Sequence, residues 1–259
     1  MILMSSTVPA PLPDQPAGGP PALSQGQRIV NAFVAPSKTF EDIRRSASWW
    51  LPWLLLVLGT MGFSITLAQK VDLEPMIRQQ IANSARAQQF DSLPKEQQEQ
   101  QIALGVKIGK IFTYFTPVFA ILIALLISLI LWGTFNFIHA ADLSFGRTLA
   151  IYFYGTLPGL VYAVLGIISL ALKADTEGIN VRNAVATNVA YFLDYANTPK
   201  FLYGMAGMLD VIVIWQIALL GMGFSINSAN RKLTSGTAIA TVAGLYLFYK
   251  LIFSALGWV

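Results

Sequence analysis

Asp210 and Lys250 are the ionisable side chains that lie well inside long apolar stretches of this sequence. Charged groups in a membrane interior are costly, and they usually have a partner or a function. If the apolar stretches 203–226 and 236–258 form antiparallel helices, both groups lie roughly 10–12 Å from the same end. A carboxylate and an ammonium at equal depth predict an intramembrane ion pair that fixes the register of the two helices. The alternative interpretation is a proton or ion site.

Few other residues could carry a reaction. The chain has no Cys, and His139 is its single His, so thiolate chemistry, disulfides and His-rich metal sites are excluded. The sequence contains none of the motifs of zinc proteases, Ser hydrolases or P-loop nucleotide-binding proteins. We therefore expect no catalytic residue, no metal and no cofactor, and a protein that is not an enzyme.

The overall composition is that of a membrane protein. Of the 259 residues, 55% are hydrophobic and 12% are charged, and the mean hydropathy is +0.58. Soluble domains carry about 25% charged residues, so an ordinary soluble enzyme is excluded. The net charge of +4 is spread along the chain without a basic block, which argues against nucleic acid as a partner. The expected environment is a lipid bilayer.

Five windows have the roughly 20 mostly apolar residues that a transmembrane helix needs. They are 49–68, 111–138, 148–172, 203–226 and 236–258. The windows lack the alternating pattern of membrane strands, and a helix satisfies its own backbone hydrogen bonds in lipid. The sequence thus predicts an all-α, polytopic integral membrane protein, with a bundle of five transmembrane helices in residues 49–258.

The regions outside these windows differ in composition. Residues 1–27 are rich in Pro and Gly and poor in large apolar residues, so we expect a disordered tail. The first loop, residues 70–110, is rich in Gln, Glu, Lys and Ala, which favour helices. We expect two extramembrane helices there, over 73–90 and 93–110, the second continuing into the second span.

Residues 28–48 form an amphipathic segment between the tail and the first span. Phe33 and Phe40 belong to apolar stripes with near-helical spacing, whereas Arg44 and Arg45 belong to a cationic face. One interpretation is a helical segment that lies on the inner leaflet of the membrane. The other is a short helix that packs against the bundle. The sequence leaves both open.

Small and helix-breaking residues within the spans indicate close contacts between helices. Gly155 and Gly159 form a GxxxG pattern that contains Pro158, and Gly223 lies in the fourth span. Trp215 lies in the middle of that span, where an indole usually packs and donates to a neighbouring helix. We interpret these residues as packing positions.

Basic residues next to the spans indicate the orientation. Arg44 and Arg45 directly precede the first span, and Arg231 and Lys232 lie in a tight hairpin between the last two spans. Because Lys and Arg near span ends favour the cytoplasmic side, we expect a cytoplasmic N-terminus.

Three stretches of the sequence resemble the Yip1 domain family in its prokaryotic branch. They are APSKTF at 35–40, DLSF at 142–145 followed by LAIYFYGTLP at 149–158, and LDVIVIWQ at 209–216. The resemblance covers about residues 28–258. It implies a five-span bundle with a cytosolic N-terminus, and we expect a multi-pass protein of the bacterial cytoplasmic membrane.

Eukaryotic members of this family associate with Rab GTPases and with each other in vesicle trafficking. Their DLYGP-type motif is not evident here, because Asp142 and Leu143 are followed by Ser144, Phe145 and Gly146. A GTPase partner is therefore doubtful. Homo- or hetero-oligomers with other membrane proteins are the partners that remain.

Two functions follow from the sequence. The leading hypothesis is a non-enzymatic scaffold or adaptor in membrane organisation or trafficking-like processes. The alternative is a small-solute or ion transporter, or a channel, that uses a polar seam near Asp210 and Lys250. A cavity that reaches Asp210 would favour transport, and a solid bundle would favour the scaffold.

Overall fold

The computed structural model describes residues 21–70, 72–82, 87–172, 183, 185–195 and 197–256. Most of the expected tail, residues 1–27, therefore lies outside the described residues. Within the described ranges the ordered elements are helices, and strand pairing is limited to an isolated bridge between Asn188 and Asp210. The all-α fold class that the apolar composition predicts is confirmed.

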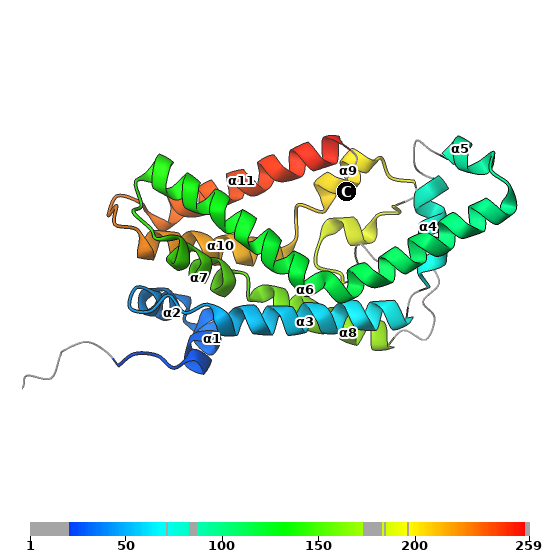
Figure 1. The fold of residues 1–259 in the computed structure, drawn as a ribbon. Coiled ribbons are helices and arrows are strands. Elements are labelled where there is room, and N and C mark those ends of the chain that lie inside the picture. Colours follow the sequence, from blue (N-terminus) through cyan, green and yellow to red (C-terminus); the bar gives the residue numbers. More distant parts are fainter. Residues whose placement is uncertain are drawn as a thin grey trace, which may run out of the picture.

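Long apolar helices make up most of the molecule (Figure 1). Among the described residues, four helical segments are long and apolar enough to cross a membrane. They are α3 (Trp50–Lys70), the Tyr114–His139 part of α6 (Lys95–His139), α7 (Phe145–Gly155) continued by α8 (Pro158–Leu172), and α11 (Ser235–Ala255). A further apolar helix, α10 (Val211–Asn227), is shorter, with 17 residues.

The expected fourth span, 203–226, is divided into two helices. The first, α9, covers Lys200–Ala206, and α10 begins only at Val211. The Asp210 carboxylate accepts hydrogen bonds from the backbone N–H of Ile212 at 2.8 Å and of Val213 at 3.2 Å, as a helix N-cap does. Asp210 therefore starts a helix instead of lying inside one, and this corrects the expected boundary of the span.

The first loop is helical, as its composition predicts. It contains α4 (Leu73–Ala82) and α5 (Ala87–Asp91), and α6 begins at Lys95 and continues without a break into the membrane segment. The Arg78 guanidinium on α4 bridges to α6 through Glu99 at 2.9 Å and also contacts Glu74 at 2.8 Å. Hydrogen bonds to Glu99 and Glu74 raise the pKa of Arg78, so this bridge stays charged.

Two short helices, α1 (Gln25–Val34) and α2 (Pro36–Ile43), lie at the other end of the bundle from α4 and α5 (Figure 1). Ser24 and Gln27 form a capping box that starts α1. Pro36 occupies the first position of α2, where its missing N–H costs nothing. These local signals produce a helical hairpin, here called the α1–α2 hairpin.

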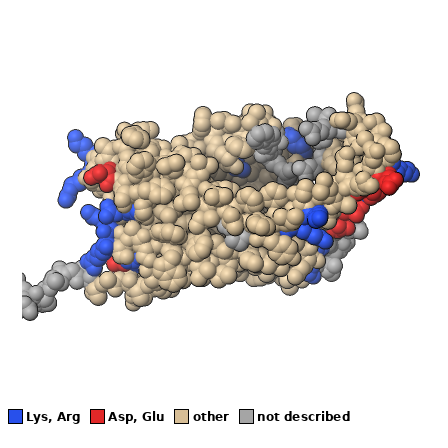
Figure 2. All heavy atoms as spheres, in the orientation of Figure 1, with Lys and Arg blue, Asp and Glu red and all other residues tan. Residues whose placement is uncertain are grey.

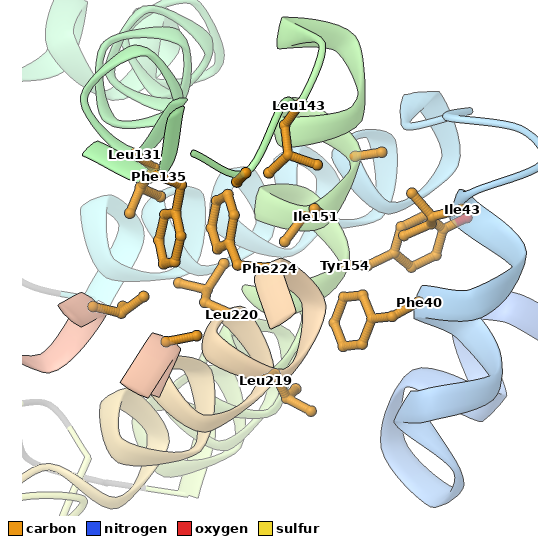
Figure 3. Packing of buried hydrophobic residues seen from close by; sticks show 14 of the residues in the cluster. Phe40, Ile43, Leu131, Phe135, Leu143, Ile151, Tyr154, Leu219, Leu220 and Phe224 are labelled. Carbon is orange, nitrogen blue, oxygen red and sulfur yellow. The ribbon is translucent and has the colours of Figure 1, made fainter. Parts of the chain in front are cut away.

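The main apolar core lies where α2, α6, α7, α10 and α11 meet. The rings of Phe135 on α6 and Phe224 on α10 stack with centroids 3.9 Å apart. Figure 3 shows Phe40 and Ile43 of α2 near Tyr154 and Ile151 of α7. All of these side chains are buried, so the α1–α2 hairpin is part of the same packed unit as the membrane helices.

Gly223 allows α10 to approach α2 and α7 closely. A Cβ atom at this position would lie 2.7 Å from Phe40 Cε1 and 2.7 Å from Ile151 Cγ2. Such distances are shorter than real carbon contacts, and the neighbours are fully buried. The expected packing role of Gly223 therefore has a specific geometric basis: only a residue without a side chain fits between the two helices.

We predict that Gly223→Ala destabilises the protein by about 1–3 kcal/mol, because the added methyl overpacks a buried contact. The loss is measured as a lower thermal midpoint in detergent. Gly244→Ala on α11 is the matched control, since nothing lies within 4 Å of a Cβ there. Equal midpoints for the two variants would show that α10 does not depend on this close approach.

Candidate functional site

A polar cavity of about 400 Å³ lies among α8, α9, α10, α11 and the segment around Asn188. Polar side chains from all of these elements face it. They are Tyr162, Asn183, Asn188, Tyr203, Asp210, Gln216, Tyr246 and Lys250. Because spans that face only lipid and each other need no such groups, this cavity is the candidate functional site.

The Asp210 carboxylate is fully engaged by the protein. One oxygen accepts from the hydroxyl of Thr187 at 2.7 Å and from the amide of Asn188 at 3.3 Å. The other accepts the two backbone hydrogen bonds from the first turn of α10. The residue is 7% exposed, and the positive end of the helix dipole adds to the stabilisation of its charge.

Asp210 also connects α10 to the preceding segment. The backbone N–H of Val211 donates to the carbonyl of Thr187 at 2.9 Å, next to the bridge between Asn188 and Asp210. The side chain of Asn188 donates to Asn183 at 2.9 Å, and Asn183 is hydrogen-bonded to Tyr203. This network forms one wall of the cavity.

Lys250 lines the same cavity, on α11. In the part of the chain that the structure describes, the Lys250 ammonium and the Asp210 carboxylate do not approach within 4.0 Å. Asp210 does not lie inside a continuous helix, and its carboxylate turns toward the backbone of α10 and toward Thr187. The two groups are brought to one cavity, and their pairing stays a prediction.

Sequence reasoning missed Thr187, Asn188, Tyr162 and Tyr246. The aspartate that precedes an apolar run was an available N-cap signal. Tyr246 stands four residues before Lys250, and that spacing places both on the same face of α11. Nothing in the sequence pattern around Tyr162 or Thr187 indicated that they would face Asp210.

The Gly155 to Gly159 region packs α7 and α8 against α10. A Cβ at Gly155 would lie 2.6 Å from Leu220 Cδ2, and one at Gly159 would lie 3.2 Å from the Gln216 amide nitrogen. Pro158 is the first residue of α8, so it separates α7 from α8. The arrangement is consistent with the packing interpretation of these residues.

A buried ion pair holds the α1–α2 hairpin together. The Arg28 Nε donates to Asp42 Oδ2 at 2.6 Å, and the side chains are 3% and 5% exposed. Arg28 also donates from Nη1 to the carbonyl of Ser46 at 2.9 Å, and Thr39 donates to the carbonyl of Arg28 at 2.9 Å. Sequence reasoning did not anticipate this pair.

The hairpin packs on the bundle, and this favours the second of the two interpretations of residues 28–48. Phe40 is fully buried, and the Asn227 amide on α10 donates to the Phe40 carbonyl at 2.9 Å. Phe33 contacts Trp215 edge to face, with centroids 5.7 Å apart. The interfacial role of Phe33 and of the segment stays a prediction, but Phe40 is enclosed by protein.

Arg44 and Arg45 follow α2 and are exposed. On the face shown in Figure 2, basic side chains outnumber acidic ones at the end of the molecule where Figure 1 places α1 and α2. Acidic and basic side chains gather at the opposite end, and a broad uncharged zone separates the two ends. This distribution is that of a protein whose middle zone lies in lipid.

The helices and the uncharged zone define a multi-pass integral membrane protein that contains a polar cavity. The model of the Yip1 domain family matches residues 30–256. The chain therefore belongs to the Yip1 domain family. Comparison with curated proteins and with solved structures gave no match.

We predict that Asp210→Ala lowers the thermal midpoint more than Asp210→Asn does. Alanine removes the cap of α10, which costs about 0.5–2 kcal/mol, whereas asparagine is itself a good N-cap. Lys250→Met should have a small effect, because no ion pair within 4.0 Å is lost. Matching losses for Asp210→Asn and Lys250→Met, with recovery in the double variant, would instead support the ion pair.

We predict that Arg28→Met destabilises the protein by about 3–5 kcal/mol, because it leaves the Asp42 carboxylate buried without its counter-charge. The double variant Arg28→Met with Asp42→Leu should regain most of the loss, since no buried charge remains. Thermal unfolding in detergent measures both. Arg44→Met is the control on an exposed arginine of the same hairpin, and a loss as large as that of Arg28→Met would refute the assignment.

Proposed function

We propose that the protein is a non-enzymatic membrane scaffold or adaptor of the Yip1 type, which acts through the exposed basic face of its α1–α2 hairpin. The observation that carries this proposal is the attachment of the hairpin to the bundle. A buried ion pair joins the two helices of the hairpin, and the buried Phe40 ring and a hydrogen bond from Asn227 attach the hairpin to the membrane helix α10. A rigidly presented surface binds partners at a lower entropic cost than a free tail.

The chemistry of the exposed face indicates its partners. Lys38, Arg44 and Arg45 are exposed on this hairpin, and Arg231 and Lys232 are exposed on the loop after α10. Such a face suits an acidic protein surface next to the headgroups of a cytoplasmic leaflet. We place this end in the cytoplasm, and the protein in a bacterial cytoplasmic membrane, because positive span ends favour that side.

The apolar core supports a scaffold over a channel. Along α10, the last residue that lines the cavity, Gln216, is followed about one turn later by Leu219 and Leu220, and Phe224 lies one further turn along; all three are buried in the core. Leu157 between α7 and α8 is also fully buried there. A polar pathway would have to cross this packed layer, and the polar lining of the cavity does not extend into it.

The cavity reaches Asp210, and this feature favours the second candidate, a small-solute or ion transporter. Asp210 and Lys250 both line it, and the break between α9 and α10 beside it is the kind of interrupted helix that forms transporter sites. In this conformation the cavity ends on the apolar core, so transport would need the core helices to separate. The experiment below distinguishes the two functions.

We predict that Arg44→Gln with Arg45→Gln reduces the recovery of partner proteins several-fold, because the basic face loses two charges. The measurement is co-purification from native membranes, with quantification by mass spectrometry. The control is Lys107→Gln with Lys110→Gln, two exposed lysines of α6 near the other end of the molecule. Recovery that is unchanged by the hairpin variant would contradict the proposal.

A flux measurement tests the transporter function separately. The purified protein in proteoliposomes would move a solute or an ion, and Lys250→Met would abolish that flux while leaving co-purification intact. Such a result would replace the scaffold function with the transporter function.

A further inference from the structure

We propose that the polar cavity binds a phosphate group, with the Lys250 ammonium as its counter-charge and the hydroxyls of Tyr162 and Tyr246 as hydrogen-bond donors. A phosphate on a lipid headgroup and a free phosphate share this chemistry. The proposal does not depend on the scaffold function, because the cavity lies on α8–α11 and not on the α1–α2 hairpin.

The hydrogen-bond inventory of the cavity shows which groups are left for a ligand. Among the described residues, the oxygens of Asp210 accept four hydrogen bonds from Thr187, Asn188 and the first turn of α10. In contrast, Lys250, Tyr162 and Tyr246 face the cavity, and within the described chain their polar atoms form no hydrogen bond or ion pair. Lys250 can only donate, and each tyrosine hydroxyl can donate as well, so a ligand rich in acceptors could bind all three groups.

The charges of the cavity also favour an anionic ligand. The Asp210 carboxylate accepts hydrogen bonds from its neighbours and lies at the positive end of the α10 dipole, which weakens its repulsion of an anion, and little of the residue is exposed. Lys250 is the basic residue of the cavity lining and is only partly buried. An anion next to Lys250 would satisfy the ammonium, whereas a cation would find the Asp210 oxygens already occupied.

The three donors come from two helices that line the same cavity. Tyr246 and Lys250 are four residues apart on one face of α11, and Tyr162 faces the same cavity from α8. A tetrahedral phosphate carries several acceptor oxygens and can accept from donors on both helices at once. The cavity volume of about 400 Å³ lies within the range of small-ligand sites.

The depth of Lys250 suits a group at the membrane interface. α11 ends at Ala255, five residues beyond Lys250, which corresponds to about 7–8 Å along the helix. A lysine near a span end extends its ammonium toward the headgroup layer.

The test uses the purified full chain in a maltoside detergent, which contains no phosphate. Isothermal titration calorimetry measures binding of dihexanoyl phosphatidylglycerol, of inorganic phosphate, and of dihexanoyl glycerol, which lacks the phosphate. We expect saturable binding of at least one phosphate probe and none of dihexanoyl glycerol. Lys250→Met should weaken that binding about tenfold or more, because it removes a charge-assisted contact.

Matched variants separate the site from general effects. Tyr246→Phe should weaken binding several-fold, whereas Tyr249→Phe should not, because Tyr249 is exposed on α11 and packs on Phe253. Lys250→Arg should restore binding that Lys250→Met loses, and Lys232→Met in the exposed loop should bind as the unchanged chain does. If Lys250→Met fails to fold, the binding measurement is made with Tyr162→Phe and Tyr246→Phe, and weaker binding is expected for both.

The outcomes identify the source of the phosphate. Binding of the lipid alone assigns the cavity to a headgroup, and binding of inorganic phosphate as well assigns it to a free phosphate group. Absence of binding by both phosphate probes overturns the proposal. Equal affinity in Lys250→Met, or equal binding of dihexanoyl glycerol, also overturns it, because the affinity would then come from acyl chains or from another surface.

Discussion

The Phe40 ring lies against the backbone of α10 at Gly223, and the position of the α1–α2 hairpin depends on this contact. The ring fills a space that any side chain at Gly223 would occupy, and it lies beside Ile151 and Tyr154 of α7. Because α7 and α10 both reach the ring, the hairpin joins two membrane helices that are distant in sequence. Because this contact positions α2, the buried ion pair between Arg28 and Asp42 then positions α1 relative to the bundle.

The helical membrane fold could be predicted because apolar runs of this length have few alternatives in lipid. The long extension of α6 was also predictable, since Gln, Glu, Lys and Ala all favour helix. The division between α9 and α10 was not found, because Asp210 was interpreted as an ion-pair partner inside a span and not as an N-cap. A capping signal at Asp210 outweighed the apolar residues on both sides of it.

The cavity could be located only in part from the sequence. Asp210 and Lys250 stood out because ionisable residues are rare within apolar runs. Thr187 and Asn188, which also line or border the cavity, did not stand out, because Thr and Asn are common residues in a polar loop. The Arg28–Asp42 pair escaped notice for a similar reason: the two residues are on separate helices, and the turn at Ala35 and Pro36 brings them together.

The length of α6 gives the molecule a built-in spacer. Its 45 residues correspond to about 68 Å, whereas a bilayer core is about 30 Å thick. The 19 residues before Tyr114 therefore hold the tip of the helix about 28 Å beyond its apolar part. Together with α4, which packs along it, this extension holds the first loop away from the membrane. A tilt of α6 within the bilayer would move that tip sideways, and the displacement would grow with the length of the extension.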